Sequence, residues 1–253
     1  MTGGNGGLGR ALAAGLRDAG ARVAVCGRDP AKNAATAAAF GPDMPVIEMD
    51  VTDEGSVERG IARVTSELGR LDVLVNNAGN FRGGFALEEP LADWRSVIET
   101  HLTGAWLCAR HAARAMVRQG TGGKIINISS VMSRFGANDF ADYTAAKSGV
   151  EGLTRSLAVE WARFGIQVNA ILPGYFDTDM SAGMPEWLRA SIVAKTPGRR
   201  WGRPEELIGP VVFLASRASD WVTGACLPVD GGYLVQDRFY DPRLFGEDPT
   251  SGS

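Results

Sequence analysis

Short apolar runs alternate with amphipathic stretches along most of the chain. The apolar runs predict buried strands at residues 22–27, 45–49, 71–75, 124–128, 166–171 and 226–229. Apolar residues at helical spacing predict helices between them, at residues 7–19, 31–39, 53–68, 91–118, 142–164 and 204–216. Strands that are apolar throughout, with helices between them, are typical of a parallel sheet covered on both faces. We therefore expect an α/β fold with a doubly wound parallel sheet.

The alternation breaks in two places. Residues 174–203 contain Met, Trp, Pro and Gly, and we expect a mobile lid over a substrate site at residues 175–200. Residues 236–253 end in polar and turn-forming residues, which predicts a C-terminal tail. No linker or repeat divides the rest, so residues 1–235 are expected to form a single domain.

Composition excludes several classes of protein. Apolar residues make up 45% of the chain, enough for a sizeable core. The 26 basic and 29 acidic residues give a net charge of −3, which offers no general attraction for nucleic acid or anionic lipid. We find no signal peptide and no apolar run of membrane-spanning length, so we expect a cytoplasmic protein without nucleic-acid or membrane partners. Three widely spaced Cys and two His predict neither disulfides nor a metal site.

The chain begins with a glycine-rich segment, in which Gly3, Gly7 and Gly9 lie at the start of the first predicted helix. Glycines there allow the backbone to approach a pyrophosphate, which the free N–H groups of a helix N-terminus can bind. A flexible turn is the alternative interpretation. Such a loop should follow a central strand, whose loss would leave buried groups unpaired at about 1–3 kcal/mol each. Because only Met1 and Thr2 precede Gly3, we expect a truncated first strand, with about 5–10 further residues upstream or another segment in its place.

Five motifs resemble those of the short-chain dehydrogenase/reductase family, in the family's order and at its spacings, over residues 2–235. They are TGGNGGLG at 2–9, NNAG at 76–79, Ser130 with Tyr143 and Lys147, Pro173-Gly174 followed by Thr178, and Asp230-Gly231-Gly232. The resemblance implies a Rossmann-type sheet and an NAD(P)-dependent oxidoreductase that interconverts a carbonyl and a secondary alcohol by hydride transfer. The stretch at 200–216 is similar to that of gluconate 5-dehydrogenases and also to that of 3-oxoacyl-carrier-protein reductases.

Tyr143 and Lys147 are four residues apart on a predicted helix, so they share one face. An ammonium group beside a phenol favours the phenolate and lowers the phenol pKa from about 10. The resemblance implies that Tyr143 is the general acid/base and that Ser130 orients the substrate oxygen. His101 occupies a position where many members have an Asn that holds a water near the Lys. Either His101 takes over this relay, with a pH dependence near 6.5, or the relay is impaired.

The resemblance also implies the cofactor contacts. Gly27 stands where NAD-selective members have an Asp, and Arg28 could pair with a 2′-phosphate, so NADP(H) is favoured, with NAD(H) as the alternative. Asp50 matches a residue that contacts adenine. The implied cofactor residues are Gly3, Asn5, Gly7, Leu8, Gly9, Arg28, Asp50, Val51, Asn77, Gly79, Tyr143, Lys147, Pro173, Gly174, Phe176 and Thr178.

The substrate and the partners stay open at this point. Loops 80–90, 131–142 and 175–197 are expected to line a small-molecule site, with Phe81, Phe85, Phe135, Phe140, Met180, Met184 and Trp187 as apolar wall and Arg82, Arg134, Asn138 and Asp139 as polar contacts. Thr121 and Phe164 stand where carrier-protein reductases have their two docking Arg, which counts against a carrier-protein partner. The resemblance suggests a homotetramer through helices 104–118 and 144–163. A cofactor-binding protein with impaired or lost catalysis is the alternative to an enzyme.

Overall fold

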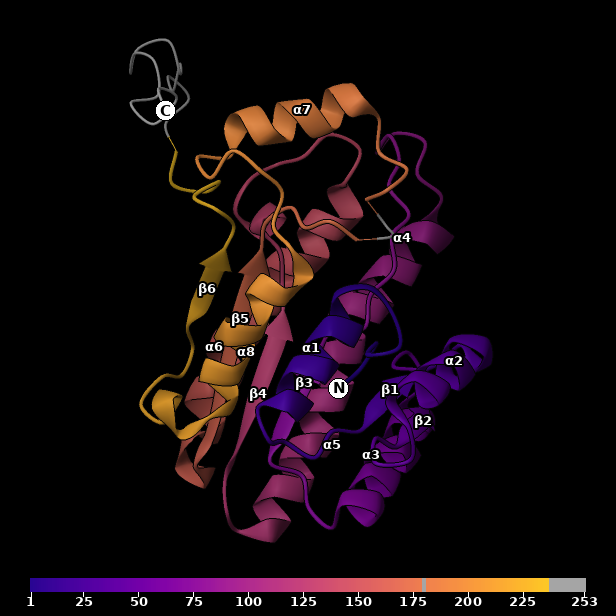
Figure 1. Ribbon diagram of the computed structural model, residues 1–253, viewed down its shortest axis with the longest axis vertical. Helices are drawn as coiled ribbons and strands as arrows, with labels where there is room; N and C mark the ends of the chain where they lie inside the picture. Colours follow the sequence, from indigo (N-terminus) through magenta and orange to yellow (C-terminus); the bar gives the residue numbers. More distant parts are fainter. Residues whose placement is uncertain (179–180, 237–253) are drawn as a thin grey trace, which may run out of the picture.

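The computed structural model describes residues 1–178 and 181–236 and has one parallel sheet as its centre (Figure 1). At one end β1 (Val25–Gly27) pairs with β2 (Val46–Glu48). At the other end four strands pair in chain order: β3 (Val73–Asn76), β4 (Gly123–Ile128), β5 (Ile166–Pro173) and β6 (Cys226–Val229). Every pairing is parallel, and the expected α/β class is confirmed.

The N-terminal segment connects the two parts of the sheet. The Thr2 amide donates to the Val75 carbonyl at 3.0 Å, and the Gly3 amide donates to the Cys26 carbonyl at 2.7 Å. On the same side as the Gly3 bond, the Cys26 amide of β1 donates to the Met1 carbonyl at 2.8 Å, whereas the Thr2 bond reaches β3 on the other side. The order across the sheet is therefore β2, β1, residues 1–3, β3, β4, β5 and β6. Three residues occupy the central position instead of a full strand. Their backbone groups form hydrogen bonds with both neighbouring strands, β1 and β3, at the end nearest the glycine-rich loop.

Helices cover both faces of the sheet. One face packs against α3 (Glu54–Leu68), α5 (Gly104–Gln119) and α6 (Ala141–Trp161), and the other against α1 (Gly7–Asp18) and α8 (Ile208–Ala215) (Figure 1). Successive residues of a strand point to opposite faces, so Leu74 and Ile125 enter the first core and Val75 and Ile126 enter the second. This two-sided burial explains why the strands are apolar throughout.

The helices begin and end at residues suited to those positions. Helix α2 (Pro30–Phe40) follows Asp29, whose carboxylate accepts from the amides of Ala31 and Lys32. Helix α3 follows Asp53, which accepts from the Ser56 amide, and it is followed by Gly69 in the left-handed region. These local signals explain why both helices were predictable from the sequence.

The helix predicted at 91–118 is not regular. It consists of α4 (Leu91–Ile98), a π-helical segment (Glu99–Thr103) and α5. A π segment widens one turn of a helix, and such segments are frequent at functional sites. The helix predicted at 204–216 likewise begins with a 3₁₀ turn (Pro204–Leu207) before α8.

The predicted lid region contains a helix that the sequence pattern did not indicate. Helix α7 (Glu186–Lys195) lies at one end of the molecule, beyond the carboxyl ends of the strands (Figure 1). Only Ile192 of this helix is fully buried, so no apolar stripe marks it in the sequence. Met180 and most of the predicted tail lie outside the described residues.

Two smaller expectations concern membranes and cysteines. Within residues 1–178 and 181–236, no helix has the length and apolar character needed to cross a membrane. Cys26 and Cys108 are buried free thiols, and Cys226 is a half-buried free thiol.

The Thr2 hydroxyl gives a test of the N-terminal segment. Its oxygen accepts from the amides of Asn77 and Ala78, both at 3.0 Å, and the side chain is buried. Thr2→Val keeps the shape but leaves two buried N–H groups unpaired, so we expect the free energy of unfolding to fall by about 1–3 kcal/mol or more in urea denaturation. Thr2→Ser keeps the hydroxyl and serves as the control. Equal stability of the two variants would contradict this role.

Candidate active site

Three side chains meet at the carboxyl ends of β4 and β5. Ser130 lies two residues beyond β4, and its hydroxyl accepts from the Met132 amide at 3.2 Å in the following 3₁₀ turn. Tyr143 and Lys147 lie on the first two turns of α6. The Ser130 side chain is close enough to the Tyr143 phenol to act on its pKa, and Lys147 Nζ lies 5.4 Å from the centre of the Tyr143 ring. The structure therefore brings the three predicted residues together.

Burial sets the charge state of these groups. Lys147 is buried, and its Nζ donates to the Ile128 carbonyl at 2.7 Å. Desolvation lowers the Lys147 pKa to about 7, because a buried ammonium loses its hydration. Desolvation raises the Tyr143 pKa to about 12, although the hydrogen bond from Ser130 acts in the opposite direction. The lowered phenol pKa predicted from the sequence is therefore wrong for the chain's own residues, because burial has the largest effect and raises it.

His101 lies in the π-helical segment and is buried beside Tyr143, with ring centres 5.2 Å apart in an edge-on arrangement. Its Nε2 lies 2.8 Å from the Asn80 carbonyl oxygen and 3.2 Å from the Asn80 amide nitrogen. The shorter contact assigns the proton to Nε2, which leaves Nδ1 as the acceptor. Burial, followed by the charge of Lys147, lowers the His101 pKa to about 3. The expected titration near 6.5 is therefore wrong, because the imidazole stays neutral at ordinary pH.

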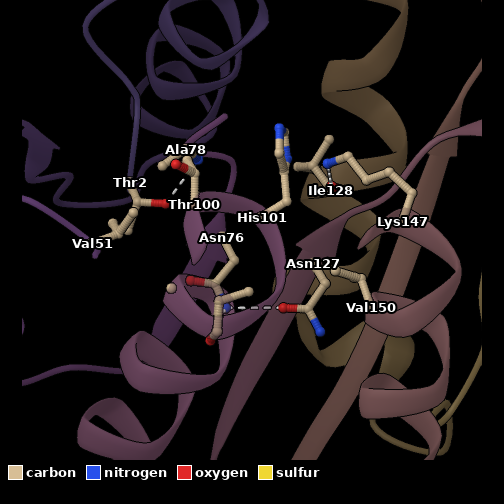
Figure 2. Close-up of a pocket in the computed structure, with 12 residues that line it drawn as sticks. Thr2, Val51, Asn76, Ala78, Thr100, His101, Asn127, Ile128, Lys147 and Val150 are labelled. Carbon is tan, nitrogen blue, oxygen red and sulfur yellow. Dashed lines mark hydrogen bonds between the residues drawn. The ribbon is translucent and has the colours of Figure 1, made fainter. Parts of the chain in front are cut away.

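A small cavity of about 10 Å³ separates the π-helical segment from α6, and His101 and Lys147 both line it (Figure 2). Its polar lining includes Asn76, which donates to Asn127 at 2.9 Å, as the dashed line in Figure 2 shows. His101 Nδ1 is buried without a hydrogen-bond partner among the described residues. This volume is about the space that one water molecule needs, and the orphaned acceptor supplies a polar partner for it.

The glycine-rich loop leaves the N-terminus of α1 open. Gly3 and Gly7 have φ values of 61° and 48°, in the left-handed region that favours glycine. A Cβ on Gly9 would lie 2.3 Å from the Gly3 carbonyl oxygen, whereas a Cβ on Gly7 would meet no atom within 4 Å. No side chain caps the helix at Gly6. The free N–H groups and the open space above them fit a pyrophosphate.

Asn77 fastens this loop to the end of β3. Its Nδ2 donates to the carbonyl oxygens of Thr2 and Gly3, at 3.2 and 3.0 Å. Leu8, in the first turn of α1, is partly buried against the core on the α1 face. The predicted cofactor residues of this region therefore lie together around one helix N-terminus.

The region after β1 has a side chain that sequence reasoning missed. Asn33 accepts from Asn5 Nδ2 and donates to the Gly27 carbonyl, both at 2.8 Å. A Cβ on Gly27 would lie 2.2 Å from Asn5 Nδ2, so the Asp of NAD-selective members does not fit here without a shift. Arg28 is more than half exposed, with Nη1 3.8 Å from Asp50 Oδ2. No short-range pattern would have marked Asn33, since it lies six residues away on α2.

The segment after β5 completes the cofactor side. The Gly174 amide, next to Pro173, donates to the Val229 carbonyl at 2.9 Å, and a Cβ there would lie 2.7 Å from Asp230 Cα. The Phe176 ring packs into the core on the α1 face. The Thr178 amide donates to Ser181 Oγ at 2.9 Å.

Two further predicted residues approach the catalytic side chains. Val51 lines the cavity beside His101. A Cβ on Gly79 would lie 2.6 Å from His101 Cε1, so the backbone there must stay bare for the imidazole to fit.

The substrate side is largely aromatic. The Phe81 ring lies 5.1 Å from that of Phe140 and 6.4 Å from that of Tyr143. Phe135 contacts Tyr233, which packs against Tyr175, and sequence reasoning did not single out these two tyrosines. Of the other predicted wall residues, Phe85 and Trp187 are exposed and Met184 is half-buried.

The predicted polar contacts already have partners. Arg82 lies 3.5 Å from Asp93, and Arg134 lies 2.6 Å from the buried carboxylate of Glu151. Asn138 donates to the Asp139 carboxylate at 2.8 Å. The cations expected on the substrate side are therefore balanced within the protein.

Comparisons with known proteins show which family the chain is similar to. A family model described as "Enoyl-(Acyl carrier protein) reductase" matches residues 3–234. Cis-4-hydroxycyclohexanecarboxylate dehydrogenase of Sinomonas cyclohexanicum is 44% identical over 240 residues, covering 93% of this chain and 95% of that one. A 2-dehydro-3-deoxy-D-gluconate 5-dehydrogenase of Escherichia coli is 40% identical, covering 93% and 94%. A crystal structure of gluconate 5-dehydrogenase from Burkholderia cenocepacia, in complex with NADP and tartrate, is 36% identical with a TM-score of 0.87, covering 93% and 94%.

Fold and site together define an oxidoreductase that acts on a CH–OH or C=O group. The chain belongs to the short-chain dehydrogenase/reductase family.

Proposed function

We propose that the protein transfers hydride reversibly between NADP(H) and a small carbonyl compound or secondary alcohol, with Tyr143 as general acid/base. The observation that carries this proposal is the convergence of Ser130, Tyr143 and Lys147 beyond the end of β4, with Lys147 Nζ 5.4 Å from the centre of the Tyr143 ring. A nucleotide-binding protein without catalysis has no need for a phenol placed in this way.

Tyr143 and Ser130 act on the substrate oxygen. The raised pKa of Tyr143 keeps the phenol protonated at neutral pH, so it can donate a proton to the carbonyl oxygen during reduction. Ser130 hydrogen-bonds the same oxygen and orients the reacting carbon. A bound nicotinamide supplies or accepts the hydride, and its oxidised ring adds positive charge that favours the phenolate needed for alcohol oxidation.

After Tyr143 has given its proton to the substrate, it is protonated again along a relay that runs through Lys147, a water in the cavity and His101. One water in that cavity would donate to His101 Nδ1, the orphaned acceptor, and would accept from Lys147 Nζ. A neutral imidazole can hold a water without titrating itself. His101 then serves as the member of the relay that other family members supply with an Asn.

The chain's residues fit NADP(H). Gly6 and Gly7 leave room for the pyrophosphate, and Lys147 would hold the nicotinamide ribose. Gly27 has no carboxylate to repel a 2′-phosphate, and exposed Arg28 can turn toward one. The related gluconate 5-dehydrogenase, solved in complex with NADP, supports this choice.

The substrate is a small molecule rather than a carrier protein. One relative is named for hydroxycyclohexanecarboxylate and another for deoxygluconate. We therefore expect the substrate among cyclic and polyhydroxylated hydroxy acids and their ketones. Trp106 and Val117 on α5 and Val159 on α6 are exposed apolar side chains, which favours a homotetramer packed through these helices.

Tyr143→Phe tests the catalytic proposal. The ring and its packing remain while the proton donor is lost, so we expect kcat to fall by about 10²–10⁴-fold. NADPH oxidation is measured across hydroxy-acid and ketone substrates, and cofactor binding is followed by fluorescence in both proteins. Unchanged turnover in Tyr143→Phe would contradict the acid/base role. Cofactor binding without turnover in the native protein would favour a binding protein.

Arg28→Asp tests the cofactor choice. A carboxylate at this position repels a 2′-phosphate and can accept from a 2′-hydroxyl, so we expect the Kd for NADPH to rise by about tenfold or more relative to that for NADH. Arg22→Asp is the matched control, since this exposed Arg binds only backbone carbonyls of residues 67 and 68. An equal loss of affinity for both cofactors would contradict selection by Arg28.

His101→Phe and His101→Asn test the relay. Phe removes the acceptor and keeps a ring, so we expect kcat to fall by about tenfold or more, whereas Asn should restore most of it. The pH–rate profiles of the native protein and of His101→Asn should coincide between about pH 5 and 8, because the His101 pKa is about 3. An active His101→Phe would rule out the relay. An inflection near neutrality that disappears in His101→Asn would show that the imidazole titrates there.

A further inference from the structure

The mechanism above leaves a buried carboxylate on α6 without a role. Glu151 lies one helical turn beyond Lys147 and two turns beyond Tyr143, so the three side chains follow one another along one side of the helix. Only 4% of Glu151 is exposed to solvent. A charge is buried in a protein only where opposite charges and hydrogen bonds compensate for its lost hydration. The partners of Glu151 therefore show what this carboxylate holds in place.

The main partners of Glu151 come from the 3₁₀ turn Val131–Arg134, which directly follows Ser130. Arg134 Nε donates to Glu151 Oε1 at 3.0 Å, and Arg134 Nη2 lies 2.6 Å from Oε2, so the guanidinium binds both carboxylate oxygens. The Ser133 hydroxyl also donates to Oε1. One carboxylate of α6 thus holds the last two residues of this turn.

Further hydrogen bonds fasten the chain to α6 on both sides of Ser130. Before it, Ser129 Oγ donates to the Lys147 carbonyl at 3.1 Å. After it, Ser148 Oγ donates to the Ser133 carbonyl at 3.1 Å. These contacts set where the Ser130 side chain lies relative to the helix that carries the proposed acid/base.

The turn itself is closed by its own backbone. The Ser133 hydroxyl lies between Glu151 Oε1 and the Ser130 carbonyl oxygen, the latter at 2.6 Å, and its single hydrogen serves one of these acceptors at a time. The Ser133 amide donates to the Ser130 carbonyl at 3.1 Å in either case. Loss of the ion pair is therefore expected to loosen the turn from α6 without opening the turn.

We propose that Glu151 and Arg134 are positioning residues, whose ion pair holds the turn after Ser130 against α6 and so keeps the Ser130 hydroxyl in place for the substrate oxygen. This inference rests on the proposed role of Ser130 in orienting the substrate. The pair acts through Ser130 and not on the substrate itself.

The geometry favours this role over contact between Arg134 and a substrate anion. Both oxygens of Glu151 bind the guanidinium, and the other cation nearby, Arg155 Nη1, is 3.8 Å from Oε2. If Arg134 turned to a substrate, the buried carboxylate would keep only this more distant partner. Breaking an ion pair with one buried member costs more than breaking an exposed pair, so Arg134 is held on Glu151.

Arg134→Met tests the pair, since this side chain is half exposed and methionine retains much of its apolar length. We expect kcat for reduction with NADPH to fall by about tenfold, because a small displacement of an orienting group lowers turnover. The fall should be equal for a neutral ketone and for a keto acid, and KM should change less than kcat. Arg155→Met is the matched control and should keep the native kcat, since its exposed i,i+4 pair with Glu151 contributes little.

A double-mutant cycle tests whether the pair acts through Ser130. Ser130→Ala should lower kcat, and Arg134→Met added to it should lower kcat by less than about twofold further. Glu151→Arg combined with Arg134→Glu reverses the ion pair and should recover most of the kcat that either single variant loses. Urea unfolding is measured for every variant, and the reversed pair keeps the test valid where a single variant is unstable.

Four outcomes would overturn the inference. A native kcat in Arg134→Met, with Ser130→Ala impaired, would overturn the positioning role alone. A rise in KM confined to keto acids would assign Arg134 to the substrate anion instead. Losses that add fully in the double variant would show that the pair does not act through Ser130. Undiminished turnover in Ser130→Ala would overturn the proposed role of Ser130 and the positioning role with it.

Discussion

The site depends on the shared burial of an acid and a base. Removing Tyr143 from water raises its pKa, and removing Lys147 from water lowers its pKa, so both neutral forms become more accessible near neutral pH. Burial thus moves the two values apart, from 10.0 and 10.5 to about 12 for Tyr143 and about 7 for Lys147, which favours a protonated phenol beside an amine that readily gives up its proton. The hydrogen bond to the Ile128 carbonyl fixes the Lys147 amine at the end of β4. The sheet thus supplies the rigidity, and the exclusion of water sets the charge states of the two groups.

The same sheet edge also sets where a cofactor can lie. Residues 1–3, β3 and β5 all end at the edge where Ser130 and Tyr143 lie. In open parallel sheets ligands bind beyond the carboxyl ends of the strands. The Asn77 side chain holds the glycine-rich loop through a hydrogen bond to the Gly3 carbonyl. Gly79, two residues later, packs closely against His101. The pyrophosphate end and the reacting end of the site are therefore parts of one rigid frame.

Much of this frame could be predicted from the sequence, because its elements carry local signals. The apolar strands, and the helices that begin after Asp29 and Asp53, can be recognised from a few neighbouring residues in the sequence. The catalytic residues could be found because their spacing resembles that of a known family. What could not be predicted depends on burial and on contacts between distant segments. The Tyr143 pKa, the neutral His101 and the contact of Asn33 with Gly27 all arise only once the chain is folded. Helix α7 escaped detection because it buries too little apolar surface to leave a pattern.

The π-helical segment has a geometric consequence for the continuous helix that it forms with α4 and α5. Each residue of an α-helix turns the chain by about 100°, so the additional residue in one wide turn rotates everything beyond it by that amount. The wide turn therefore sets the rotation between α4, which contacts loop 80–90 through Asp93, and α5, whose buried face packs on the sheet. A chain shortened by one residue within Glu99–Thr103 would regain a straight helix but would turn either the core face of α5 or the imidazole away from its place. The π-helical segment thus allows one continuous helix to pack α4 and α5 against two differently oriented surfaces.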